Sequence, residues 1–493
     1  MKNHSFFLFL ILVFCFGCIA DKIKVEPNDI VIKNVNIVDV KTGIINNGMT
    51  TLIRGNTIFA IGRLDDFQLS GLGNAIDGNN KYLIPGLWDM HTHLFNESDI
   101  RNASYPLLIA NGITGIRVMA ADCLNPPCED PNMTIAQHRQ LQEEITKRQL
   151  LGPKSILASD YINGSLQGES TILKPRTEEH GRALARLLKE RGVDFIKIYD
   201  VLTPEAYYGI TDEATNIQLD FAGHVPLTLS ASKASTAGQK SIEHMYSVLL
   251  ECSDLEDEMR KRFIELFTDN QGNINYTSAK SANDLLLQVV KHYSPSKGKQ
   301  LFQTLRKNNT WFVPTIYHVE LYYPDAQDWK KSPNIKYMPK EEYDYFVNDY
   351  EPAMRALQSP YHSEVEEMRI HLIKEARNEG VGILAGSDVG EVGLVHGFSL
   401  HKELVSLQKT GLSPLEVLQT ATINPVKYQS AMDSLGTIEK GKIADLVLLN
   451  ANPLNTIANT QNIDAVITNG VLLDRKDLDS ILLRVETYIK KGF

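Results

Sequence analysis

The sequence predicts an α/β fold in which a (β/α)8 TIM barrel lies beside a small β domain that both ends of the chain build together. In residues 85–431, short apolar runs alternate with helical stretches, which is the pattern of repeated β-α units and a parallel sheet. Eight such runs can be counted, the number that closes this barrel. Residues 30–62 have a different pattern, the alternation typical of β-strands, and the same pattern is found again only at residues 436–474. The two ends are therefore expected to form one domain.

The first 29 residues are expected to be an export signal followed by a tether. MKNHSFFLFLILVFCFGC has a lysine near its start, a long apolar run and a small residue before Cys18. This ending resembles a bacterial lipoprotein cleavage box, although Cys15 stands where leucine is usual and Phe16 is bulky. We expect residues 1–18 to be the signal, Cys18 to be lipidated, and residues 19–29 to be a polar tether. The protein is then exported, as a periplasmic or membrane-anchored lipoprotein of a bacterium. An ordinary signal peptide or an uncleaved anchor is the alternative.

The β domain is predicted to span residues 30–84 and 432–480. VIKNVNIVDV and TTLIRGNTIFAIG have the alternation of strands, and Arg54-Gly55-Asn56 forms a tight turn within the second. The far end supplies GTIEKGKIADLVLLN and AVITNGVLLD, which have the same texture.

The barrel strands are predicted from eight apolar runs, which are LIPGLWDM, ITGIRVMA, KSILAS, DFIKIY, LDFAGHV, KSIEHM, WFVPTIY and VGILAGSD. Helical candidates lie between several of them, for example at 178–192. The connections 246–310 and 318–380 are longer than one helix needs, so insertions are expected over the barrel mouth. The sequence Ser-Pro-Leu-Glu at 413–416 resembles a capping box with proline at the first helical position, and it predicts a helix there.

Composition and charge exclude several classes of partner. The 493 residues include 43% hydrophobic and 22% charged residues, which is typical of a globular protein. The net charge of −10, without a basic block, argues against nucleic acid. Nothing after residue 20 approaches the ~18 apolar residues that span a bilayer. Membrane contact is therefore expected only through the signal or lipid anchor, and a homo-oligomer remains compatible with the sequence.

Three cysteines follow the signal. Cys123 and Cys128 flank a turn-rich loop, and export favours a disulfide between them. The two prolines of that loop could instead hold the thiols apart. Cys252 is expected to be unpaired.

Ionisable residues stand at the carboxyl ends of the predicted barrel strands. His91 and His93 end the first strand and, being two residues apart, point to the same face. Barrel enzymes place their chemistry at this end, and burying such groups without partners costs several kcal/mol each. The later strands supply Lys197, His224, His244 and Asp388. The resulting four imidazoles and one carboxylate suit zinc or a similar divalent ion.

Lys197 has two interpretations. It could form a structural ion pair with Asp200 or Asp388. Alternatively, a desolvated and deprotonated amine could react with carbon dioxide, and the resulting carbamate could bridge two metals. Four histidines exceed the roughly three protein ligands of one catalytic metal, and this surplus favours two Zn²⁺ or other divalent ions per chain.

These residues and motifs resemble the metal-dependent amidohydrolase superfamily, specifically its imidazolonepropionase-like branch, which includes Xaa-Pro dipeptidases. The matching pieces are LIPGLWDMHTHL, IKIYD, GHV, SIEHM, AGSD, LQTATINPVKY and LGTIEKGKIADLVLLNANP, within residues 30–475. The resemblance implies a β-sandwich assembled from both chain ends. It also implies one metal on His91, His93 and Asp388, another on His224 and His244, and a carboxylated Lys197 between them. The lysine matches the dipeptidase-like relatives better than imidazolonepropionase, which resembles a one-metal member.

The expected reaction is cleavage of an amide bond in a small substrate, a dipeptide or acyl-amino acid, by a metal-bridging hydroxide. Asp388 is expected to take the proton and pass it to the leaving amine, although a purely structural cap at this strand end is the alternative. A cyclic amide or lactone hydrolase, a deaminase and a non-catalytic binding lipoprotein are the competing functions. The complete ligand set argues against the last. Candidate substrate-binding residues, chosen as donors to a terminal carboxylate, are Tyr161, Arg176, Tyr199, Tyr317 and His318, with His396 and His401 as weaker candidates.

Overall fold

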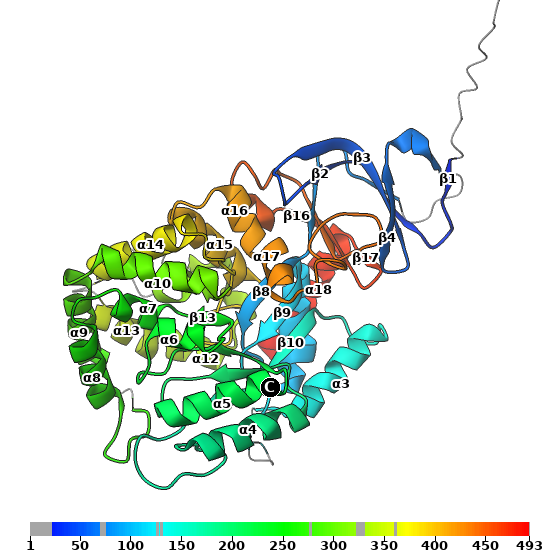
Figure 1. Ribbon diagram of the computed structural model, residues 1–493. Coiled ribbons are helices and arrows are strands. Elements are labelled where there is room, and N and C mark those ends of the chain that lie inside the picture. Colours follow the sequence, from blue (N-terminus) through cyan, green and yellow to red (C-terminus); the bar gives the residue numbers. More distant parts are fainter. Residues whose placement is uncertain are drawn as a thin grey trace, which may run out of the picture.

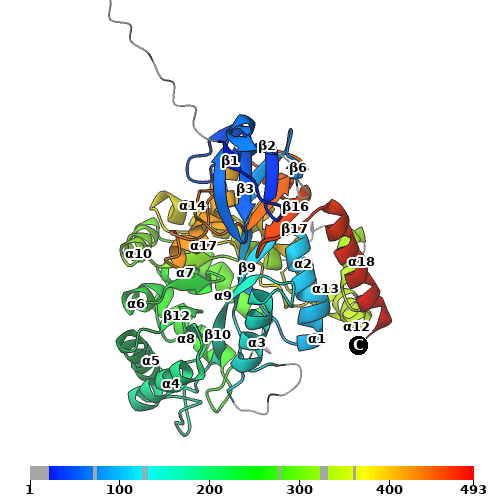
Figure 2. The same ribbon diagram turned by 90° about the vertical axis from the view of Figure 1, so that its right-hand side faces the viewer.

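The computed structural model describes residues 22–69, 75–124, 128, 132–275, 279–321, 331–358 and 362–492. The predicted signal, with Cys18, lies outside the described residues. Figures 1 and 2 show a β-rich domain beside a larger α/β body, and strands from both ends of the chain lie together in the β-rich domain. Within the described part of the chain, every helix is too short or too polar to cross a membrane.

The β-rich domain is built on one eight-stranded sheet. Its strand order is β17-β16-β15-β7-β2-β3-β4, with β6 paired to β2. A second sheet pairs β1 (Ile23–Lys24) with β5 (Phe67–Gln68). The larger sheet contains β2 (Ile30–Val38), β3 (Ile45–Arg54), β4 (Thr57–Gly62), β6 (Ala75–Asp77), β7 (Tyr82–Pro85), β15 (Leu446–Leu449), β16 (Ile463–Thr468) and β17 (Val471–Leu473).

The alternating sequence of these strands explains why both faces of the sheet are covered. Ile30 and Ile32 of β2 pack into one apolar cluster, whereas Val31 between them packs into another with Leu52 and Phe67. Because successive side chains of a strand point to opposite faces, one short sequence supplies both clusters.

The body confirms the predicted (β/α)8 fold class. Seven parallel strands follow one another in sheet order exactly as in the sequence, from the first to the seventh. They are β8 (Leu87–Thr92), β9 (Ile113–Val118), β10 (Lys154–Ile162), β11 (Phe195–Ile198), β12 (Asp220–Gly223), β13 (Ser241–Glu243) and β14 (Trp311–Val313).

The segment 381–389 takes the eighth position as isolated bridges rather than a continuous strand. Ile383 pairs with Phe312 of β14, and Val389 pairs with Thr92 of β8. The Asp388 N–H also donates to the His91 carbonyl at 2.8 Å. The segment therefore lies between the first and seventh strands and closes the ring.

The predicted first strand, LIPGLWDM, is divided between the two domains. Ile84 pairs with Val447 in the β-rich sheet, whereas Leu87 begins β8 of the barrel. Gly86 lies between them, and a Cβ at this position would come 2.0 Å from the Thr114 hydroxyl. Only glycine allows this close approach, so the chain passes from one sheet to the other here.

The predicted seventh strand, 311–317, is shorter than expected. It ends at Val313, and Thr315 takes a left-handed φ of 47° before helix α11 (Ile316–Glu320). Pro314 between them has no N–H to continue the ladder. Tyr317 and His318 consequently lie on a helix rather than at a strand end.

Helices surround the barrel and fill its long connections. Ser413 and Glu416 form the predicted capping box at the start of α16. The helices that follow successive strands include α2 (Tyr105–Ala110), α3 (Ile135–Thr146), α4 (Glu178–Arg191), α5 (Pro204–Asn216), α6 (Ala231–Thr236), α10 (Pro295–Lys307), α15 (Phe398–Lys409), α16 (Pro414–Thr420) and α17 (Ile423–Tyr428). The additional ones are α1 (Glu97–Asp99), α7 (Tyr246–Glu251), α8 (Glu256–Phe267), α9 (Ala279–Lys291), α12 (Lys340–Tyr345), α13 (Glu351–Gln358) and α14 (His362–Asn378).

The chain ends in helix α18 (Arg475–Lys491), which lies beside α2 on the barrel (Figure 2). Val485 is buried in a cluster with Ala103 and Leu107, and the Tyr488 hydroxyl donates to Asp99 at 2.9 Å. This helix ties the C-terminal strands of the β-rich domain to the body.

The cysteines after the signal are in two states. Cys123 and Cys128 are joined by a disulfide, and Cys252 is a free, buried thiol.

Candidate active site

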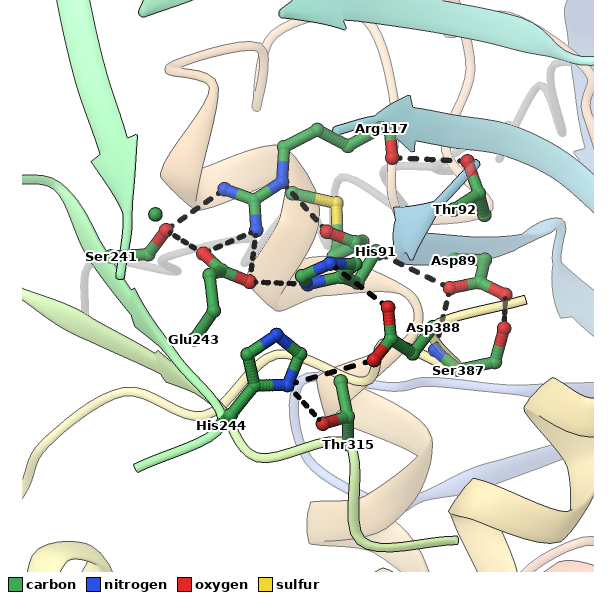
Figure 3. Close-up of polar contacts among 12 residues, drawn as sticks. Asp89, His91, Thr92, Arg117, Ser241, Glu243, His244, Thr315, Ser387 and Asp388 are labelled. Carbon is green, nitrogen blue, oxygen red and sulfur yellow. Dashed lines mark hydrogen bonds and ion pairs between the residues drawn. The ribbon is translucent and has the colours of Figure 1, made fainter. Parts of the chain in front are cut away.

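The histidines at the end of β8 meet the aspartate of the closing segment. His91 and His93 are both buried, and the Nε2 atom of each lies 3.2 Å from Asp388 Oδ1. The pairing of Val389 with Thr92 brings these residues, almost 300 positions apart, to the same end of the barrel. Two imidazoles therefore face one carboxylate at the barrel mouth, and Figure 3 shows the first of them, His91, turned toward Asp388.

The other two histidines follow β12 and β13. The His244 ring centroid is 4.8 Å from that of His91 and 4.8 Å from that of His224. His244 has a φ of 61°, a conformation that is uncommon outside glycine and recurs at functional sites. The second nitrogen of each ring is occupied, since His224 Nδ1 is 2.6 Å from Asp200 and His244 Nδ1 is 2.7 Å from the Thr315 hydroxyl.

Lys197 on β11 is a buried amine that lines the same cavity. Within the described part of the chain, its Nζ has no hydrogen-bond partner, and it forms no ion pair with Asp200 or Asp388. Burial lowers the pKa of Lys197 to about 8. The structure therefore lacks the ion pair that was the alternative to a carbamate. Because an unpaired buried ammonium is costly, the position favours an uncharged amine or a modified one.

The donor atoms of three residues converge closely enough to hold a metal ion. Those of His91, His244 and Asp388 all lie within 4.8 Å of one another. Burial lowers the pKa of His91 to about 4 and that of His244 well below its ordinary value, so both rings are in the neutral form that binds metal. Burial acts to raise the pKa of Asp388, but the surrounding imidazoles hold it well below its ordinary range. This donor set fits a divalent cation.

A buried network orients His91, and sequence analysis did not identify its central residue, Arg117. The ionised Glu243 accepts a hydrogen bond from His91 Nδ1–H at 2.8 Å, which leaves Nε2 directed at Asp388 (Figure 3). Arg117 Nη2 lies 2.8 and 2.9 Å from the two Glu243 oxygens, and the Ser241 hydroxyl donates to the same carboxylate at 2.6 Å. Such partners fix the tautomer and direction of a metal-binding histidine. The signal in the sequence was a lone arginine inside the apolar run ITGIRVMA.

Asp89 joins β8 to the closing segment. It accepts hydrogen bonds from the Ser387 N–H at 2.9 Å and from the Ser387 hydroxyl at 2.5 Å. Burial raises the pKa of Asp89 to about 7. Ser387 immediately precedes Asp388, so this contact fixes the backbone that presents the catalytic candidate.

Three of the predicted substrate-binding residues line the cavity. The Tyr161 hydroxyl lies 2.9 Å from His93 Nδ1, and the Tyr199 ring centroid is 4.4 Å from that of His224. His318 Nδ1–H donates to Asp388 Oδ2 at 2.9 Å. Burial acts to lower the pKa of His318, but this hydrogen bond and the negative charges of Asp388 and Glu391 together outweigh burial, and the pKa is raised.

The remaining candidates lie outside the cavity lining, as far as the described residues define it. Arg176 donates to the carbonyls of Gly168 and Leu166 and so braces its own loop. Tyr317 packs beside the cluster around Leu321 and Phe346, because the turn at Thr315 places it on the far side of α11 from the cavity. The two weaker candidates also have structural partners, namely the His93 carbonyl for His396, and Thr460 with the Asn111 carbonyl for His401.

The cavity has a volume of about 470 Å³, which is typical of a small-molecule site. Its floor carries the histidines, Lys197 and Asp388, and its upper walls come from α7, α8, α9, α13 and α14. The insertions therefore enclose the space above the donors. A barrel with imidazoles and a carboxylate converging at the carboxyl ends of its strands defines an enzyme with a candidate metal centre.

Comparisons with known proteins agree with this class. The family model described as the amidohydrolase family matches residues 82–473. Among solved structures, a Xaa-Pro dipeptidase with bound methionine has a TM-score of 0.60 and 20% identity, covering 90% of this chain and 100% of that one. Bottromycin amidohydrolase has a TM-score of 0.67 and 19% identity, covering 94% and 91%. A putative prolidase from Bifidobacterium longum has a TM-score of 0.59 and 21% identity, covering 93% and 98%.

Adenine deaminase from Staphylothermus marinus is 32% identical over 93 residues, a match that spans 18% of this chain and 15% of the deaminase. The family match covers most of the chain, so the protein belongs to the amidohydrolase family and is a hydrolase acting on carbon–nitrogen bonds. The resemblance drawn from the sequence motifs is thereby confirmed.

Proposed function

We propose that this protein is a metal-dependent hydrolase of an amide bond in a small substrate, a dipeptide or an acyl-amino acid. The observation that carries the proposal is the convergence of His91, His244 and Asp388 on the floor of a cavity enclosed by the inserted helices. A structural or purely binding role would not require neutral imidazoles directed at an ionised carboxylate.

The donor set supports two divalent metals, such as zinc. His91, His93 and Asp388 would hold one, and His224 and His244 the other, so that the close group of His91, His244 and Asp388 would supply donors to both. Carboxylated Lys197 would serve both. Its buried Nζ, which has no hydrogen-bond partner among the described residues, supports this role, because the amine can attack carbon dioxide, form an N–C bond and release one proton, and the resulting anion would be neutralised by the two metals. When bound, such metals lower the pKa of a coordinated water and polarise a carbonyl.

The protein's own groups handle the protons. Asp388 Oδ1 lies at the centre of the site, where it can accept a proton from the attacking water and return it to the leaving amine. His318 donates to the other oxygen and holds the carboxylate in place. Tyr161 stands at the edge of the site, and its hydroxyl can donate to a developing oxyanion.

The test is an assay of purified, zinc-loaded protein against a library of dipeptides, acyl-amino acids, lactams, lactones and aminopurines. We expect hydrolysis of the first two classes. Release of ammonia from an aminopurine would instead favour a deaminase, the activity named for the partial match. An absence of hydrolysis throughout the library would leave the binding lipoprotein as the better explanation.

Replacing Lys197 by alanine is expected to lower the metal content from two ions per chain to one, because the bridging carbamate is lost. Elemental analysis measures this directly, and labelling with ¹³C-bicarbonate should give a carbamate resonance in the native protein alone. Lys240→Ala is the control, since Lys240 forms a more exposed ion pair with Asp220. Two metals retained in Lys197→Ala would contradict the bridge.

We propose further that the protein is exported and anchored through Cys18. The apolar run that precedes this cysteine supports the proposal. Expressed in a bacterium with its full N-terminus, Cys18→Ala is expected to move from the membrane fraction to the soluble fraction, or to remain as unprocessed precursor. Unchanged, fully processed protein in the membrane fraction would exclude the lipid anchor.

A further inference from the structure

A buried carboxyl group outside the cavity contacts the turn that leads to His318. Glu403 lies on α15, and its side chain is fully buried, although it is not part of the cavity lining that the described residues define. Its neighbours on the helix, Leu400 and Leu404, pack into the barrel core. A carboxyl group in such surroundings is costly unless it makes hydrogen bonds, so its contacts indicate its role.

Those contacts are with the backbone of the turn. Glu403 Oε2 accepts a hydrogen bond from the Tyr317 N–H at 2.8 Å, and the Ile316 N–H also donates to this carboxyl group. The second carboxyl oxygen, Oε1, has no hydrogen-bond partner among the residues that the structure describes. Burial raises the pKa of Glu403 to about 8, so near neutral pH the group is mainly uncharged and acts as a hydrogen-bond acceptor.

The turn needs an acceptor from outside because its own threonine is engaged elsewhere. The first N–H groups of a helix have no partner within the helix, and a threonine directly before the helix is a common acceptor for them. Thr315 has this position before α11 but makes no such bond, since its hydroxyl lies 2.7 Å from His244 Nδ1 (Figure 3). Glu403 therefore supplies the acceptor that Thr315 does not.

The conformation of the turn also requires support. Thr315 has a φ of 47°, which is unfavourable for a β-branched residue and persists only where surrounding contacts hold it. Before the turn, the His244 N–H donates to the Val313 carbonyl at 3.0 Å. After it, Glu403 holds the Tyr317 N–H. The left-handed residue is thus fixed from both sides.

Two side chains of this turn act directly on metal-ligand candidates. Thr315 contacts His244, and His318 Nδ1–H donates to Asp388 Oδ2 at 2.9 Å. Because Thr315 and His318 are three positions apart, a shift of the turn would displace both contacts together. Partners of this kind direct metal-binding side chains, and their loss typically costs about 10- to 100-fold in metal affinity or activity.

We propose that Glu403 is a positioning residue for the metal centre, which holds the turn at residues 314–318 so that Thr315 orients His244 and His318 orients Asp388. This role rests on the proposed metal-dependent hydrolysis and deepens it, because Glu403 acts through the backbone of the turn and contacts neither substrate nor metal.

Glu403→Leu is expected to lower both the affinity for Zn²⁺ and kcat/KM by about 10- to 100-fold, because leucine fills a similar volume but offers no acceptor. Competition with a chromogenic chelator measures the affinity without turnover. Steady-state kinetics of the metal-loaded enzyme on the best substrate measures kcat/KM. Glu403→Gln should recover most of the loss in both quantities, because its amide oxygen can accept from the same N–H groups.

Glu320→Leu is the matched control, because Glu320 also joins α11 to α15. It lies at the other end of α11, where its Oε2 accepts from the Ser406 hydroxyl at 2.6 Å and from Lys409 Nζ at 2.9 Å. This variant should lower the Tm but keep native Zn²⁺ affinity and native kcat/KM. Circular dichroism should show that all the variants are folded.

Native Zn²⁺ affinity in a folded Glu403→Leu protein would overturn the proposal. An equal loss in Glu320→Leu would overturn it too, since any contact between the two helices would then have the same effect. A loss in Glu403→Gln as large as in Glu403→Leu would exclude the acceptor role.

If Glu403→Leu does not fold, Glu403→Asp takes its place, because its carboxyl group is one methylene short of the turn. Native Zn²⁺ affinity in that variant would equally contradict positioning by Glu403. If the native enzyme cleaves no substrate, the proposed function fails separately, and the Zn²⁺ affinities still decide the role of Glu403.

Discussion

Asp388→Asn is expected to lower kcat/KM by about 10²–10⁴-fold, the usual contribution of a general acid–base group. Asparagine keeps the shape and can still accept the hydrogen bond from His318, but it has no charge and cannot take up a proton. Steady-state kinetics on the best substrate of the library measures the loss, and elemental analysis reports whether metal content falls as well.

Asp464→Asn is the matched control, because Asp464 lies on β16 and pairs with Lys81 in the β-rich domain. It should retain native kcat/KM. Circular dichroism should show that both variants are folded. If the Asp388→Asn enzyme is folded and has native activity, Asp388 is a structural cap of the strand end and not a catalytic residue.

Arg117→Met is expected to reduce the free energy of unfolding by about 3–5 kcal/mol, the typical cost of leaving a buried charge without its partner. Arg117 and Glu243 are both fully buried, and Arg117 Nη2 donates to both carboxylate oxygens of Glu243. Burial acts to raise the pKa of Glu243, and the Arg117 guanidinium instead holds it well below its ordinary value. Without the guanidinium, an ionised carboxylate would remain in the core. Urea denaturation measures the change.

The double variant Arg117→Met/Glu243→Gln should recover part of this stability, because glutamine removes the charge and its amide oxygen can still accept from His91. Arg182→Met is the surface control. Its ion pairs with Glu178 and Asp212 are solvent-exposed, so its cost should stay below about 1 kcal/mol. A loss for Arg117→Met no larger than for Arg182→Met would show that the buried pair contributes little.

Much of the barrel could be predicted because its signals are local. A parallel strand buried on both faces appears as a short apolar run, and seven of the eight predicted runs became strands in the expected order. The candidate ligands could be chosen for the same reason, because a polar residue at the end of such a run lies at one edge of the sheet. His91 and His93 share a face simply because they are two residues apart.

The bounds of elements at turns were less predictable. The first run crosses from one domain to the other at Gly86, where the Thr114 side chain leaves no space for a Cβ. The seventh ends early, and the left-handed turn at Thr315 moves Tyr317 away from the cavity and His318 toward Asp388. Apolar runs continue through both places, so hydrophobicity alone gives no sign of either change.

Three features could be identified from local patterns in the chain, namely the alternation of strands and helices, the two ends that share a domain, and the ionisable residues at the barrel mouth. The information on these points lies within a few neighbouring positions. The folded structure was needed to show that Arg117 and Glu243, 126 positions apart, orient His91, that Lys197 has no ion-pair partner among the described residues, and that Glu391 and Arg369 line one cavity. These are contacts between side chains from different strands and insertions, and the packing of the whole barrel, rather than any local pattern, brings them together.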